Sequence, residues 1–71
     1  MDYQELQHSD SIKGLSHNGQ SLTVHFENGR VYEFDGVPEQ VADQLAEAES
    51  PGRFFHRYVK PFYNGAEVTE D

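Results

Sequence analysis

Apolar and polar side chains alternate between residues 11 and 34, and this alternation predicts three β-strands. The strands read SIKGLS, SLTVHFE and RVYEF, and the turn-forming segments HNGQ and Asn28-Gly29 separate them. Connections this short join antiparallel neighbours, whereas parallel strands need a long crossover. The three strands are therefore expected to form an antiparallel meander.

Beyond Phe34 the apolar residues recur every three or four positions, which is typical of helices. Pro38 suits the first turn of such a helix. Its apolar positions are Val37, Val41, Leu45 and Ala48. Another face carries the carboxylates of Glu39, Asp43 and Glu47.

A second helix is expected after Ser50, a good N-cap, with Pro51 in its first turn and Pro61 at its end or at a kink. Its apolar side is formed by Phe54, Phe55, Tyr58, Val59 and Phe62. The predicted fold class is α+β: a three-stranded antiparallel meander followed by two short helices packed on one sheet face. Residues 1–71 are expected to be a single domain, ordered from about 9 to 63, with flexible acidic tails at both ends.

The register of the hairpin around Asn28-Gly29 has two alternatives. A two-residue turn pairs Val24 with Glu33 and places Tyr32 beside His25, away from the other apolar residues. A three-residue connection, with Gly29 left-handed in a bulge, pairs Val24 with Tyr32. The second register gathers Leu22, Val24, Phe26, Tyr32 and Phe34 on one face. We favour it because each ring moved out of the core forfeits roughly 1.5–3 kcal/mol, although the first register stays open.

Composition narrows the function classes. The chain has no cysteine, which excludes disulfides and thiolate chemistry, and its net charge of −8 weakens a simple nucleic-acid interpretation. The N-terminal residues lack the features of a signal peptide, and no apolar run is long enough to cross a bilayer. The expectation is a soluble cytoplasmic protein, monomeric or weakly dimeric, without a membrane.

Positive charge is nevertheless concentrated. Of the five Lys and Arg residues, Arg53, Arg57 and Lys60 fall on the predicted second helix, beside His56. Gly52 lies at the start of that helix, where backbone N–H groups favour an anion. These residues, with Tyr32 as an aromatic contact, are the candidate nucleic-acid or anion site. The alternative is that the basic stripe pairs with acidic neighbours such as Asp43, Glu47 and Glu49.

Catalytic and metal sites have no support in the sequence. His8, His17, His25 and His56 lack the spacing of metal ligands, and no Ser, His or Asp lies in a nucleophile motif. We therefore expect no enzyme activity, no metal and no cofactor.

Two stretches resemble the KTSC domain, a module found at the C-terminus of some lysyl-tRNA synthetases and as a free-standing small bacterial protein. The first is LTVHFENGRVYEFDGVP, in which Tyr32-Glu33-Phe34 corresponds to the family's Tyr-x-Tyr motif with phenylalanine replacing the second tyrosine. The second is AESPGRFFHRYVKPFY. The resemblance covers roughly residues 9–63. It implies a small domain without an established activity, for which attachment to a tRNA-charging enzyme suggests RNA binding.

Two functions from different classes follow. The first is a non-enzymatic RNA- or nucleic-acid-binding module that uses the basic second helix. The second is a protein-interaction module that uses the acidic helix or the sheet face formed by Thr23, His25, Val31 and Glu33.

Overall fold

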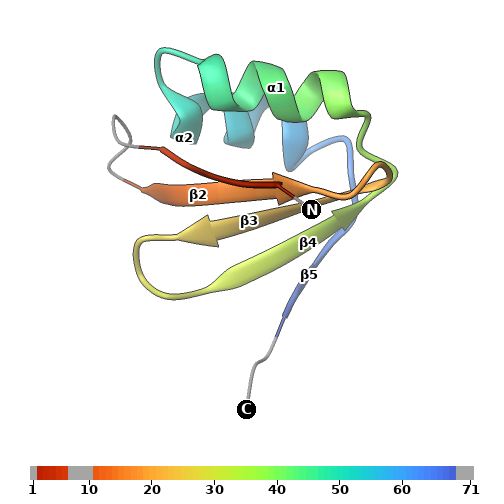
Figure 1. The fold of residues 1–71 in the computed structure, drawn as a ribbon, viewed down its shortest axis with the longest axis horizontal. Helices are drawn as coiled ribbons and strands as arrows, with labels where there is room; N and C mark the ends of the chain where they lie inside the picture. The colour runs from red at the N-terminus through yellow and green to blue at the C-terminus, as the bar shows by residue number, and fades with distance from the viewer. Residues whose placement is uncertain (1, 7–10, 69–71) are drawn as a thin grey trace.

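The computed structural model describes residues 2–6 and 11–68 and has a five-stranded antiparallel sheet with helices on one face (Figure 1). The strands pair in chain order: β1 (Asp2–Glu5), β2 (Ile12–His17), β3 (Ser21–Phe26), β4 (Val31–Asp35) and β5 (Gly65–Glu67). The helices are α1 (Glu39–Glu47), α2 (Pro51–Phe54) and η1 (Phe55–Val59). The predicted α+β class is confirmed.

The prediction of three strands was wrong, because both segments expected to be loose tails contain an edge strand. β1 pairs with β2, and the buried Leu6 extends this pairing by donating its N–H to the Lys13 carbonyl at 2.9 Å. β5 is exposed throughout and pairs with β4, and Val68 N–H bonds the Val31 carbonyl at 2.8 Å. Both edge strands are held by backbone hydrogen bonds. Such bonds produce no pattern of apolar residues in the sequence from which a strand could be predicted. The rest of the expected tails, residues 1, 7–10 and 69–71 with His8 among them, lies outside the described residues.

The hairpin adopts the bulged register. Val24 pairs with Tyr32 and Leu22 with Phe34, while Phe26 N–H bonds the Arg30 carbonyl at 2.9 Å. Gly29 has a φ of +91°, which glycine adopts without steric cost. The favoured prediction is confirmed: Tyr32 shares a face with Val24 and not with His25.

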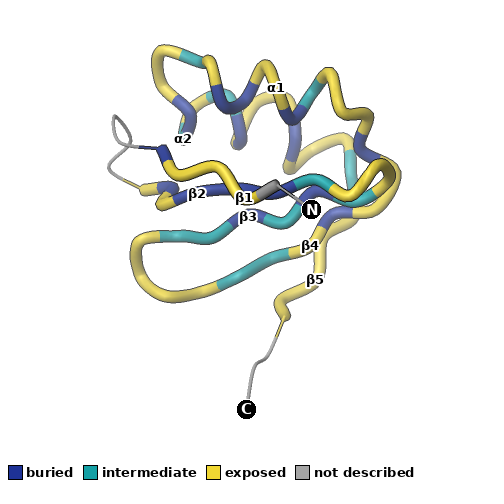
Figure 2. Tube along the Cα trace, viewed as in Figure 1, coloured by how far each residue is buried: buried dark blue, intermediate teal, exposed yellow. Residues whose placement is uncertain are grey.

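The core lies between this sheet face and the helices (Figure 2). Leu22, Val24 and Phe34 from the hairpin are buried there, together with Phe55 and Val59 from η1. Phe26 and Tyr32 pack against this core but are only partly buried. The helical cover therefore leaves the Phe26–Tyr32 end of the face partly open.

Each helix differs in one respect from its predicted apolar side. In α1 the buried positions are Ala42, Leu45 and Ala46, whereas Val41 and Ala48 are half-buried. In the second helical segment Tyr58 and Phe62 are 52% and 71% exposed, so neither belongs to the core. For the second helical segment the reason is a change of helix geometry.

The chain widens into a π-turn across η1, where Lys60 N–H donates to the Phe55 carbonyl five residues earlier at 2.9 Å. A wider turn shifts the angular position of every later side chain relative to an α-helix. The helix ends before Pro61, as expected.

A histidine joins the β2–β3 turn to the start of α1. His17 Nε2 donates to the Val37 carbonyl at 2.5 Å, while Nδ1 accepts the Gly19 N–H at 3.1 Å. Val37 N–H in turn donates to the Gln20 carbonyl at 3.1 Å. The imidazole therefore bridges two connections that are twenty residues apart in sequence.

Replacing His17 by alanine is expected to lower the free energy of unfolding by about 1–2 kcal/mol, since it removes both hydrogen bonds of the ring. Urea denaturation followed by circular dichroism measures the change. His56→Ala is the matched control, because that ring is exposed and surface substitutions usually change stability by about 0.5 kcal/mol or less. Equal stabilities of the two variants would contradict the bridging role.

No helix in the described ranges is long and apolar enough to span a membrane.

Candidate functional site

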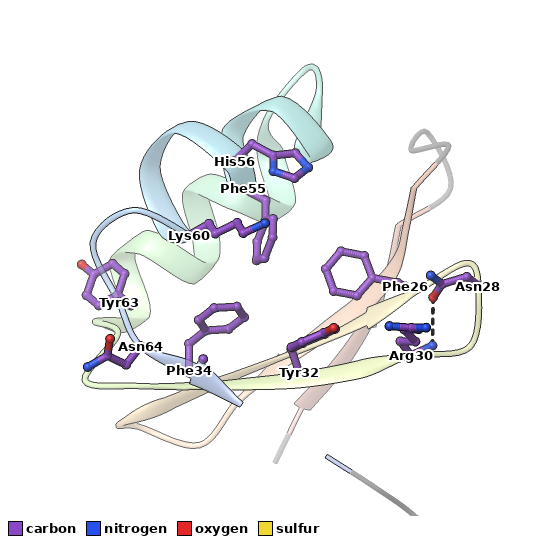
Figure 3. Close-up of a pocket in the computed structure, with 11 residues that line it drawn as sticks. Phe26, Asn28, Arg30, Tyr32, Phe34, Phe55, His56, Lys60, Tyr63 and Asn64 are labelled. Carbon is purple, nitrogen blue, oxygen red and sulfur yellow. Dashed lines mark hydrogen bonds between the residues drawn. The ribbon is translucent and has the colours of Figure 1, made fainter. Parts of the chain in front are cut away.

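A pocket of about 600 Å³ opens at the partly covered end of the sheet, between the hairpin, η1 and β5 (Figure 3). Its aromatic lining comprises Tyr63 and a wall of four rings, those of Phe26, Tyr32, Phe34 and Phe55. We call it the aromatic pocket. Phe34 and Phe55 are buried, whereas Phe26 and Tyr32 are half-buried, so the rings extend from the core to the surface.

Polar side chains complete the aromatic pocket. His56 and Lys60 reach it from the helical segment, and Arg30 from the hairpin (Figure 3). Asn28 and Asn64 also line it, and Asn28 Oδ1 accepts the Arg30 backbone N–H at 3.0 Å. The pocket thus combines an aromatic wall with cationic and amide donors.

The Arg30 side chain is tied to the aromatic wall. A hydrogen bond between the Arg30 guanidinium and the Tyr32 side chain raises the pKa of Arg30, and the nearby Glu67 carboxylate raises it further. Arginine remains protonated in proteins in any case, so Arg30 adds a positive charge to the lining of the pocket. Glu67 would compete with an anionic ligand for this charge, since it lies opposite Tyr32 on β5.

A second depression, of about 560 Å³, lies beside the first. Its lining residues are Ser11, Ser50, Gly52, Arg53, His56 and Arg57, and we call it the arginine depression. His56 lines both hollows, so they adjoin at this residue. Part of the space beside Gly52 is filled by Ser11, whose Oγ would lie 2.6 Å from a Cβ at position 52.

Charge is strongly segregated between these hollows and the rest of the chain. Arg30 and Lys60 line one and Arg53 and Arg57 the other, so four of the five Lys and Arg residues meet here. The chain contains 13 Asp and Glu residues, yet among the described residues no carboxylate lines either hollow. Asp43, Glu47 and Glu49, the alternative partners of the basic stripe, line neither hollow.

All five predicted site residues line one of the two hollows, but they do not form one stripe. Tyr32 and Lys60 lie in the aromatic pocket, whereas Gly52, Arg53 and Arg57 lie in the arginine depression. The π-turn at η1 accounts for this division, because it rotates Lys60 relative to the preceding arginines.

Sequence reasoning missed Arg30, Phe26, Tyr63 and Asn64 as site residues. A signal for Arg30 was present, since residues two apart on a strand share a face and Arg30 precedes Tyr32 by two. Tyr63 and Asn64 gave no comparable signal, because they lie in the connection between η1 and β5, where no helical or strand periodicity places a side chain.

The opposite sheet face carries no helix (Figure 1). Thr23, His25 and Val31 are half-buried on the strands, and Glu33 is exposed. The ring of Tyr3 on β1 meets His25 edge to face, with 5.0 Å between centroids. This face has no hollow comparable to the aromatic pocket among those lined by the described residues.

Within residues 2–6 and 11–68, no group of three or more His, Asp and Glu side chains is placed to hold a metal ion.

Comparison with known proteins identifies the family. The profile of the KTSC domain matches residues 8–63, which include the hairpin and both parts of the second helical segment. The crystal structure of a KTSC domain protein from Yersinia pestis superimposes with a TM-score of 0.84 at 27% identity, covering 96% of this chain and 97% of that one.

Relatives fall into two kinds. A lysine–tRNA ligase of Trichormus variabilis is 44% identical over 41 residues, which are 58% of this chain but only 7% of the ligase. An uncharacterised protein of Stutzerimonas stutzeri is 38% identical over 55 residues, covering 75% of this chain and 78% of its own length. The family therefore occurs both within a much longer enzyme and in a chain of similar size. On the profile match and the shared fold, this chain belongs to the KTSC domain family.

Proposed function

We propose that this protein is a non-enzymatic binding module for RNA, and that the two adjoining hollows form its contact surface. One observation carries the proposal: four of five Lys and Arg residues line these hollows in a chain of net charge −8. If the five Lys and Arg residues were distributed at random among the 13 Asp and Glu residues, we would expect no positive region on the surface. Their convergence supports a site for an anion.

Local charges decide binding at such a site. Exposed charges farther apart than a Debye length, about 8 Å at physiological ionic strength, are largely screened from one another. The carboxylates of Glu39 and Asp43 on α1 line neither hollow, whereas Glu67 lies near Arg30 and opposes a phosphate there. The cations of the hollows act at contact distance and are screened least.

The aromatic wall favours RNA over a simple anion. Single-stranded nucleic acids bind where a basic groove follows the backbone and exposed aromatic side chains stack on bases. The aromatic pocket supplies rings beside Arg30 and Lys60, and the arginine depression supplies further charge. Similarity to a segment of a lysine–tRNA ligase supports the same conclusion, since that enzyme handles tRNA.

Arg57→Ala is expected to weaken binding of a short single-stranded RNA by about 10–150-fold at low salt, the cost of one charged hydrogen bond. The slope of log K against log salt should fall in magnitude by about 0.7, the value for one phosphate contact on a single strand. Fluorescence anisotropy of a labelled RNA measures both quantities.

Lys13→Ala is the matched control. It removes one positive charge from an exposed residue that lines neither hollow, so it changes the net charge equally. The proposal requires binding by the wild-type chain and a larger loss for Arg57→Ala than for Lys13→Ala. Absence of binding at low salt, or equal losses for both variants, would contradict it.

A second candidate is a protein-interaction module that uses the helix-free sheet face. The observation favouring it is Tyr3, which is 49% exposed and contacts His25 on that face. Pull-down with wild-type and Tyr3→Ala protein, with Arg57→Ala alongside, separates the candidates. A partner retained by Arg57→Ala but lost by Tyr3→Ala supports this second function.

A further inference from the structure

The four rings of the aromatic wall, those of Phe26, Tyr32, Phe34 and Phe55, contact one another in series, each edge to face with the next. Tyr32 meets Phe26 at 5.6 Å and 88°, and Phe26 meets Phe55 at 5.3 Å and 77°. Phe55 then meets Phe34 at 5.3 Å and 76°. None of these pairs is stacked in parallel. Phe34 and Phe55 are buried, whereas Phe26 and Tyr32 are only partly buried, so these two supply the ring surface that a flat ligand could contact.

The pocket has a size and lining typical of a ligand site. Protein interiors are close-packed and leave few voids larger than a water molecule. Here about 600 Å³ adjoins four aromatic rings at the edge of the core, and ligand pockets usually enclose about 300–1,000 Å³. The volume of this surface pocket therefore lies within the range of known ligand sites.

The polar groups of the pocket match the chemistry of a nucleotide. A base presents flat apolar faces, and its edges carry hydrogen-bond donors and acceptors. Asn28 and Asn64 each offer an amide that both donates and accepts, and these side chains line the same pocket as the rings. Lys60 and Arg30 provide the positive charge that a phosphate requires.

We propose that the aromatic pocket holds one unstacked nucleobase against its ring wall, with the attached phosphates on Arg30 and Lys60 and on the neighbouring arginine depression. The inference deepens the proposed RNA-binding function and rests on it. His56 marks the path between the two phosphate positions, because it lines both hollows. The ligand unit is a nucleotide, within a strand or free.

Three ligands separate the contributions of base and backbone. The first is a short single-stranded RNA, the second an abasic strand of the same length, and the third adenosine monophosphate. Anisotropy, with the unlabelled ligands as competitors, gives the affinity of each. Stacking of one base contributes enough to predict that the RNA binds about 5- to 100-fold more tightly than the abasic strand.

Variants test whether the difference between RNA and abasic affinity arises in the aromatic pocket. Tyr32→Leu should bring the ratio of RNA to abasic affinity close to one, while Tyr32→Phe keeps the ring and should retain most of the ratio. Tyr58→Leu is the matched control, since Tyr58 is 52% exposed, packs on Phe54 and lines neither hollow. Circular dichroism verifies folding, and Tyr63→Leu provides a second pocket variant should Tyr32→Leu unfold.

The outcomes distinguish the two proposals. Equal affinities for RNA and the abasic strand would overturn the base pocket while leaving backbone binding intact. No binding of either strand or of the mononucleotide would overturn both. If adenosine monophosphate binds as tightly as the RNA strand, the pocket is a site for free nucleotides and RNA is not its ligand. Much weaker binding of the mononucleotide would show that the pocket holds a nucleotide within a strand.

Discussion

Phe55→Ala is expected to lower the free energy of unfolding by about 3–5 kcal/mol, as large-to-small substitutions of buried rings do. Phe55 is 5% exposed and makes edge contacts with Phe26 and Phe34, so it links the sheet to the helical cover. Small domains have a total stability of roughly 5–15 kcal/mol. The variant should therefore be partly unfolded at modest urea concentrations.

Phe62→Ala is the matched control for this loss. It makes the same chemical change at a ring that is 71% exposed, and we expect a change of about 0.5 kcal/mol or less. Urea denaturation monitored by circular dichroism compares the two variants. A small loss for Phe55→Ala would show that the aromatic wall contributes little to the core and would weaken the description of the pocket as an extension of it.

Gly65→Ala is expected to destabilise the protein by about 1–3 kcal/mol through overpacking. A Cβ at this position would lie well inside van der Waals contact with the ring of Phe34, which is 4% exposed. Either the ring moves within the core, or β5 separates from β4. Both responses disturb the aromatic pocket, because Phe34, Asn64 and Gly65 line it. RNA affinity should fall together with stability.

The Phe34→Leu substitution serves as a control, because it separates the clash between the new methyl group and the Phe34 ring from other effects of Gly65→Ala. In a Phe34→Leu background the obstructing ring is absent, so adding Gly65→Ala should cost less than it does in the wild-type chain. A double-mutant cycle of unfolding free energies measures this coupling. Additive losses would show that the methyl group acts without meeting Phe34.

The hairpin register could be read from the sequence because side-chain alternation and burial agree there. Only the bulged register gathers Leu22, Val24 and Phe34 on one face, and a slip of one residue would expose all the side chains of a strand that should be buried. The structure has this register. The positions of both helices followed from their apolar spacing for the same reason.

The sequence predicted only part of the candidate site. Arg53, Arg57 and Lys60 are close in sequence, and in the structure each lines one of the two hollows. An ideal α-helix would place them on one stripe, whereas the π-turn at η1 directs Lys60 into the other hollow. Arg30 immediately precedes β4 and Asn64 immediately precedes β5, so their meeting depends on the assembled sheet.

By itself, the sequence determined the central meander, the two helical segments and the family, and it favoured the register that the structure has, because these depend on local turns and on the periodic burial of side chains. Tertiary structure alone decided the edge strands β1 and β5, the exposure of Tyr58 and Phe62, and the union of charge and aromatic rings in one pocket. Edge pairing uses backbone groups that every residue other than proline possesses. A pocket between distant segments likewise requires their positions in space, which no local pattern records.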